Sequence, residues 1–164
     1  ELEIGRLLSA IKRERIRNVV WITADVHYCA AHYYDPTKAQ YSDFDPFWEF
    51  VAGPLNAGSF GPNALDNTFG PQLVFQKAPP AQNTSPLAGF QFFGEMRVDP
   101  RGRTLNVAFV DINGATVFAR SLEPAHGSTL CRALPRSAGK PRRRLLWHTD
   151  FPAFAAPVAA PETG

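Results

Sequence analysis

Cysteine and methionine are scarce in this sequence, and long apolar runs are missing. The 164 residues include two cysteines and one methionine. Cys29 falls in an apolar segment, where a thiol is usually a small core side chain, and Cys131 lies far along the chain, so we predict no disulfide. No segment approaches the roughly eighteen apolar residues of a membrane span, and the first residues lack the pattern of a secretory signal. We therefore expect no membrane span.

The sequence also lacks a starting methionine, and it opens at Glu1 within a segment that has a helical pattern. We therefore expect the chain to be part of a longer protein, so that the missing signal says nothing about the destination of the whole. Hydrophobic residues make up 45% of the chain and aromatic residues 12%, which is enough for one ordinary globular core.

The net charge of +2 is unevenly distributed. Residues 127–164 hold six Lys or Arg against two acids, whereas the rest of the chain holds eleven against thirteen. The one basic cluster, at 142–144, lies in Pro- and Ala-rich sequence without the interleaved aromatic residues of a nucleic-acid-binding face, so we expect no nucleic-acid partner. We expect one domain over residues 1–126 and a disordered tail over 127–164.

Apolar periodicity predicts an N-terminal helix followed mostly by antiparallel strands. Residues 2–16 follow helical spacing, with acids at the front and bases behind. Residues 19–23 are β-branched or aromatic and apolar on both faces, which is typical of a central strand in a covered sheet. Two short strands are expected at 30–34 and 47–52.

The later part of the chain divides into a long irregular segment and a meander. Gly-Pro pairs dominate residues 53–89, which we interpret as a functional loop, although the short run 73–75 could be a missed element. Alternating apolar residues then predict a hairpin over 90–109, and Asn113-Gly114, a dipeptide that type I′ turns prefer, leads into a third strand from Thr116.

Asp25 and His27 are the candidate metal ligands. They follow the apolar strand directly, near its carboxyl end, where α/β sheets hold ligands, and a period of two places them on one face. A carboxylate with a neutral imidazole suits Fe, Zn, Mn or Co, and carboxylate oxygen also suits Ca or Mg. On spacing alone, an aspartate that starts a turn and a hydrogen-bonded histidine are the favoured interpretation.

The segment Asn18–Tyr28 resembles the last metal-binding motif of PhoD-type alkaline phosphatases and phosphodiesterases, in which a hydrophobic strand runs into G-D-V-H. Ala24 replaces the usual glycine, which crowds the turn slightly and leaves both ligands in place. The resemblance covers about residues 1–125. It continues through Ala31–Pro36 and Phe47–Gly58, and through Phe92–Gly94 into the meander.

The resemblance implies an α/β fold, part of a four-layer α/β/β/α metallophosphoesterase sandwich. It also implies a dinuclear centre of divalent or trivalent ions (Fe, Ca, Zn, Mn or Co), to which Asp25 and His27 contribute, and metal-activated water that attacks a phosphate ester. The earlier metal motifs of the family have no counterpart here, so the partner would be the missing N-terminal half of the domain. We expect the fragment to be inactive by itself and assign it no catalytic side chain. An extracytoplasmic location is implied by resemblance alone.

Two further residues are weaker candidates for substrate binding. His32 could orient phosphate, although an ordinary exposed histidine is the more common case. Asn56 could hydrogen-bond a substrate, although asparagine beside glycine and proline is first of all a turn former. The alternative function is a β-rich binding or structural module that needs no metal. The strand with two apolar faces counts against it, since such a strand expects covering layers that about 125 residues hardly provide.

Overall fold

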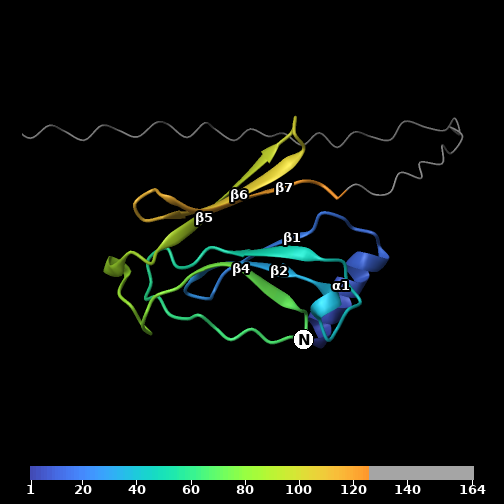
Figure 1. Ribbon diagram of the computed structural model, residues 1–164, viewed down its shortest axis with the longest axis horizontal. Helices are drawn as coiled ribbons and strands as arrows, with labels where there is room; N and C mark the ends of the chain where they lie inside the picture. The colour runs from blue at the N-terminus through green and yellow to red at the C-terminus, as the bar shows by residue number, and fades with distance from the viewer. Residues whose placement is uncertain (126–164) are drawn as a thin grey trace, which may run out of the picture. The chain divides into compact units, whose positions relative to one another are not determined.

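The computed structural model describes residues 1–125, which form one α-helix, two short 3₁₀ helices and seven strands in two sheets (Figure 1). These residues belong to one compact unit. The predicted tail and Cys131 lie outside the described residues. The helix followed mostly by antiparallel strands confirms the predicted α/β class.

Helix α1 spans Leu2–Arg13 and is shorter than predicted. Its first turn carries Glu3 and its last turn carries two bases, as the helix dipole favours. Leu8 is only 3% exposed and packs with Phe44 and Phe47. The helix also contacts the loop before β3 (Phe47–Val51), since Lys12 Nζ lies 3.1 Å from a carboxylate oxygen of Asp43.

The first sheet has the strand order β1-β3-β2-β4. β1 and β3 are parallel, and β2 pairs in antiparallel fashion with both β3 and β4. The bounds of these strands are β1 Val20–Thr23, β2 Cys29–Tyr34, β3 Phe47–Val51 and β4 Pro71–Lys77. The presence of β4 corrects the interpretation of residues 53–89 as a loop throughout. The short apolar run at 73–75 is the centre of a strand that pairs with β2.

β1 was predicted to be a central strand, and this is wrong for the residues that the structure describes. It is the edge strand of the first sheet, with β3 as its neighbour on one side. Val20 and Trp21 are partly covered, but the Ile22 side chain is 69% exposed. The other edge of β1 therefore has free backbone groups within residues 1–125.

The second sheet is the predicted meander, with the order β5-β6-β7. Its strands are β5 Phe92–Asp99, β6 Thr104–Asp111 and β7 Thr116–Leu122. The turn between β6 and β7 is not of type I′, because Gly114 has a positive φ of 78° and Asn113 does not. Asp111 stabilises this turn instead, by accepting hydrogen bonds from the backbone N–H groups of Asn113 and Ala115.

The main core lies between the two sheets. Its buried members come from β2, β3, β5 and β6, and they are Cys29, Ala31, Phe50, Phe92, Val107 and Phe109. Trp48 packs on this core, whereas its neighbour Phe47 packs on α1. Because side chains alternate along a strand, α1 and the second sheet cover opposite faces of the first sheet. The described residues thus form a helix layer and two sheet layers.

Candidate metal centre

Asp25 and His27 lie in the short connection between β1 and β2, at the carboxyl end of β1. Since β1 and β3 are parallel, the loop that follows β3 starts at the same edge of the sheet. The strand alternation used in the sequence argument stops at Thr23, and Asp25 has a positive φ of 78°. Aspartate adopts this left-handed conformation more readily than most residues. The Asp25 side chain is exposed and His27 is half-buried, so neither is sealed in the core.

The imidazole of His27 is held in one orientation by the loop after β3. Its Nδ1 lies 2.5 Å from the carbonyl oxygen of Gly58, and its ring stacks on Phe60 with 4.4 Å between centroids. The Phe60 N–H donates in turn to the His27 carbonyl over 3.2 Å. A carbonyl oxygen can only accept, so Nδ1 carries a proton, and in the neutral imidazole the lone pair is on Nε2. This is the second-sphere arrangement that metal-binding histidines use.

Buried polar groups fix the loop that holds His27. Ser59 is fully buried and donates through Oγ to the Phe90 carbonyl over 2.8 Å. The Gln91 side chain, 3% exposed, accepts from the Ala57 N–H at 3.1 Å and donates to the Ala57 carbonyl at 3.0 Å. The sequence reasoning missed these residues. A glutamine and a serine in irregular sequence carry no pattern that marks them as buried.

Glu49 on β3 connects the end of β1 to β2. Its carboxylate accepts hydrogen bonds from Thr23 Oγ1 at 2.9 Å, His32 Nδ1 at 3.0 Å and the Tyr34 hydroxyl at 2.9 Å. Thr23 is the last residue of β1, two positions before Asp25, so Glu49 fixes the strand end from which the candidate ligands emerge. Glu49 was not among the predicted site residues, although a lone carboxylate inside the apolar run at 47–51 is a signal of a buried polar partner.

The environment of Glu49 favours its charged form. Burial alone would raise the pKa of the carboxyl group, but the hydrogen bonds from His32, Thr23 and Tyr34 outweigh burial and leave the pKa lowered. The pKa of the Tyr34 hydroxyl is raised, first by burial and then by the charge of Glu49 and the hydrogen bond to it. Tyr34 therefore stays a neutral donor at physiological pH.

His32 is not the exposed histidine that was considered more common. It is 4% exposed on β2, with Nδ1 bound to Glu49. Asn56 is exposed in the loop after β3, and it lines a cavity of about 480 Å³ together with the Pro86–Ala88 3₁₀ helix and Asn113. That cavity contains neither Asp25 nor His27. The structure therefore places His27 against Gly58 and Phe60 of the loop after β3, whereas Asn56 of the same loop lines a different cavity.

The two candidate ligands fit part of a metal site. His27 presents a free imidazole nitrogen, and the Asp25 side chain makes no hydrogen bond within residues 1–125. One carboxylate and one imidazole suit several transition ions. In the described part of the chain, however, no group of three or more His, Cys, Asp or Glu side chains is placed to hold an ion.

The model of the PhoD-like phosphatase family matches residues 1–109, and the chain belongs to this family. Comparisons with curated proteins and with solved structures give no match. Membership of a phosphatase family implies hydrolysis of phosphate esters, and such phosphatases are generally metal-dependent. None of the helices described has the length and apolar character needed to cross a membrane.

Proposed function

We propose that this chain is the C-terminal part of a metal-dependent phosphatase or phosphodiesterase in which Asp25 and His27 are metal ligands. The observation that carries the proposal is the hydrogen bond from His27 Nδ1 to the Gly58 carbonyl, because it leaves Nε2 of the neutral ring as the nitrogen that can bind a metal ion. The ring stack on Phe60 and the buried anchors of the loop hold that donor before any ligand arrives.

When bound, metal ions at such a centre polarise phosphoryl oxygens and lower the pKa of water, so that a nucleophile is available near neutral pH. The residues of this chain bind and orient. Asp25 supplies a negatively charged oxygen at the strand end, His27 supplies a neutral nitrogen, and Glu49 holds Thr23 and hence the start of the turn. Two ligands do not hold a dinuclear centre, so the chain by itself is proposed to be inactive.

The remaining ligands are proposed to come from an N-terminal half of the same domain. Three features support this: the family match, the incomplete ligand set and the free outer edge of β1. A strand that pairs in parallel with that edge ends beside Asp25, because parallel strands place their carboxyl ends together. Such a half would extend the three layers toward the four-layer sandwich. An extracytoplasmic location belongs to the same proposal.

The test uses the protein extended at its amino end, assayed against a phosphomonoester and a phosphodiester with its metal content measured. We expect activity and bound metal in the extended protein and neither in the 164-residue chain. Asp25→Ala combined with His27→Ala should remove both from the extended protein, whereas Glu3→Ala, on the exposed first turn of α1, should leave both unchanged. Activity that survives the double substitution contradicts the assignment.

The second candidate function is a β-rich binding or structural module without metal chemistry. The family match to residues 1–109 argues against it, because that match includes the segment with both ligands. The same experiment separates the two. A module of this kind leaves the extended protein without phosphoesterase activity and with no metal bound.

A further inference from the structure

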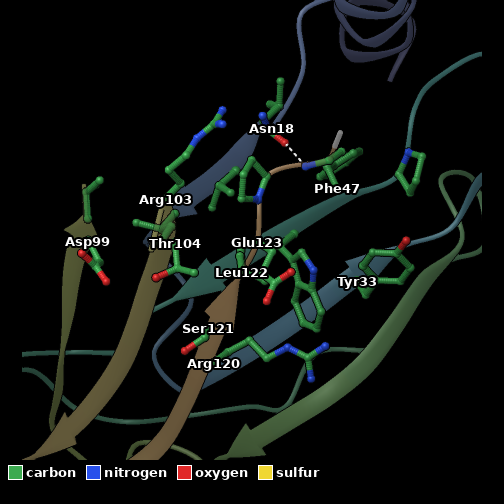
Figure 2. A pocket seen from close by; sticks show the side chains of 18 of the residues that line it. Asn18, Tyr33, Phe47, Asp99, Arg103, Thr104, Arg120, Ser121, Leu122 and Glu123 are labelled. Atoms are coloured by element: carbon green, nitrogen blue, oxygen red, sulfur yellow. Dashed lines mark hydrogen bonds between the residues drawn. The ribbon is translucent and has the colours of Figure 1, made fainter. Parts of the chain in front are cut away.

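The end of the two sheets that lies away from Asp25 and His27 contains a larger cavity, of about 660 Å³ (Figure 2). It is bounded by the starts of β1 and β3, by the connection between β5 and β6, and by the end of β7. β1 runs from this cavity at Val20 to the candidate metal turn beyond Thr23. The cavity is therefore a separate feature from the proposed metal centre.

The cavity has the size and composition of a small-molecule site. Its volume falls within the range of about 300–1,000 Å³ that ligand pockets occupy. Apolar side chains from four elements contribute to its lining, among them Val20, Trp48, Leu105 and Leu122. Apolar walls of this kind take a ligand with an apolar body, because binding removes both surfaces from water.

Two arginines provide the charge at this cavity. The guanidinium group of Arg120 lies over the Trp48 ring, 4.9 Å from its centroid, and Figure 2 shows its side chain extending from β7 toward β2, which carries Tyr33. Arg103 lies just before β6, and in Figure 2 its side chain points toward Asn18 and away from Arg120. Among residues 1–125, neither guanidinium forms an ion pair with an acid. The stack on Trp48 also restrains Arg120 before a ligand binds, which reduces the entropy lost on binding.

Two acids, Asp99 and Glu123, line the same cavity, so the formal charge of its lining is balanced. Asp99 accepts the backbone N–H of Arg101 at 2.9 Å and so belongs to the turn between β5 and β6. Glu123 is exposed near the end of the described chain. Arg120 is thus a cation beside the apolar wall that no acid pairs with among residues 1–125.

We propose that this cavity binds an organic anion with an apolar body, whose carboxylate or phosphate group pairs with Arg120, while Arg103 adds a second positive charge to the lining. The apolar body lies against Val20, Leu105 and Leu122, and the Tyr33 side chain forms part of the wall. Arginine suits this role because its planar fork binds carboxylate and phosphate oxygens in pairs. The site is independent of the metal ligands and does not rest on the proposed phosphatase activity.

Isothermal titration of the full 164-residue chain tests the proposal. The probes are naphthalene-2-carboxylate and naphthalene-2-phosphonate, compared with the neutral 2-naphthylmethanol. We expect both anions, or one of them, to bind at least tenfold more tightly than the alcohol, and the tighter anion identifies the preferred head group. Equal affinities for anions and alcohol, or no binding by any probe, would overturn the proposal.

Substitutions then locate the binding. Arg120→Met keeps the length and apolar stem of the side chain and should abolish the preference for the anion, and Arg103→Met should weaken it. Arg97→Met is the matched control, because Arg97 is 77% exposed on β5, pairs with Glu95 and does not line this cavity. An unchanged preference in both Arg120→Met and Arg103→Met contradicts the assignment. Binding lost in Asp25→Ala with His27→Ala contradicts the location, whatever the outcome for phosphatase activity.

Discussion

Glu49 and His32 are hydrogen-bonded across neighbouring strands, with 3.0 Å between Oε2 and Nδ1, on the face of the first sheet that α1 partly covers. The same carboxylate also accepts from Thr23 on β1. One side chain on β3 is therefore hydrogen-bonded to both neighbouring strands, β1 and β2. The stability of this sheet and the position of the candidate metal turn are linked through Glu49.

The first prediction concerns acid stability. Because folding lowers the pKa of Glu49, the stabilisation is present above the ordinary pKa of 4.5 and is lost as the pH falls through the folded value. Unfolding in urea at a series of pH values should therefore show stability falling below about pH 4.5. Glu49→Gln should lower stability at pH 7 by about 1–3 kcal/mol, because it weakens buried hydrogen bonds. It should also reduce the loss of stability below about pH 4.5, which we call the acid limb of the stability curve. Glu95→Gln, on the surface of β5, should keep that limb, and an acid limb unchanged in Glu49→Gln contradicts the assignment.

The second prediction separates the two nitrogen atoms of His27 in the N-terminally extended protein. Asparagine places an amide donor near the position of Nδ1, so His27→Asn should keep the hydrogen bond to Gly58 and near-normal thermal stability while losing metal. Glutamine reaches the position of Nε2 but gives up that hydrogen bond, so His27→Gln should lose about 1 kcal/mol of stability. Metal titration measures the metal affinity of each variant, and thermal unfolding measures its stability. Normal metal affinity in His27→Asn would show that Nε2 is not a ligand.

The third prediction concerns the close approach of the β3 loop to the metal turn. A Cβ atom at Gly53 would lie 2.6 Å from the carbonyl carbon of Tyr28, directly after His27. Gly53→Ala must displace backbone there and should cost about 1–3 kcal/mol in denaturant unfolding.

A matched glycine exists in α1. A Cβ atom at Gly5 would meet the Tyr41 ring at 3.4 Å, an ordinary contact distance. Gly5→Ala should therefore be neutral or stabilise the chain by up to about 1 kcal/mol, because alanine is the better helix former. Equal effects of Gly5→Ala and Gly53→Ala would show that the contact with Tyr28 is unimportant.

The fourth prediction concerns the thiol of Cys29. Burial in the core between the sheets raises its pKa to about 12, despite a hydrogen bond with the Gly53 backbone and the nearby charge of Lys77. At pH 8 only about one thiol in ten thousand is then ionised, so a thiol reagent should label Cys29 only after unfolding. Cys131→Ser leaves Cys29 as the single thiol for this measurement. Rapid labelling in the folded variant contradicts the burial.

Local patterns predicted most of the elements. Helical spacing identified α1 and strict alternation identified the meander, because both arise from which side chains face a core. The same logic identified Cys29 as a core residue, and its side chain is fully buried. β4 was missed because its segment lies among glycine and proline, and its pairing with β2 depends on residues about forty positions away in the sequence.

The position of β1 and the details of the site were not readable from the sequence. Apolar residues on both faces of a strand indicate that both faces are covered, but they do not show which elements cover them or which strands pair with it. Among residues 1–125, β1 pairs with one strand. Asp25 and His27 follow the carboxyl end of β1, as the sequence predicted. However, the strand ends at Thr23 and Asp25 has a positive φ, so the alternation that was expected to place both side chains on one face does not apply. The contacts of His27 with Gly58 and of Glu49 with Thr23 join segments distant in sequence, and no local pattern encodes them.

Within residues 1–125, β1 has one side without a partner strand, and this has a consequence for the behaviour of the chain in solution. Exposed strand backbone beside an uncovered isoleucine is a template on which a second molecule can add its own strand. The isolated chain should therefore form dimers or larger species as its concentration rises, by pairing of β1 with β1. A charged replacement such as Ile22→Lys should keep it monomeric, and sedimentation at several concentrations would measure the difference.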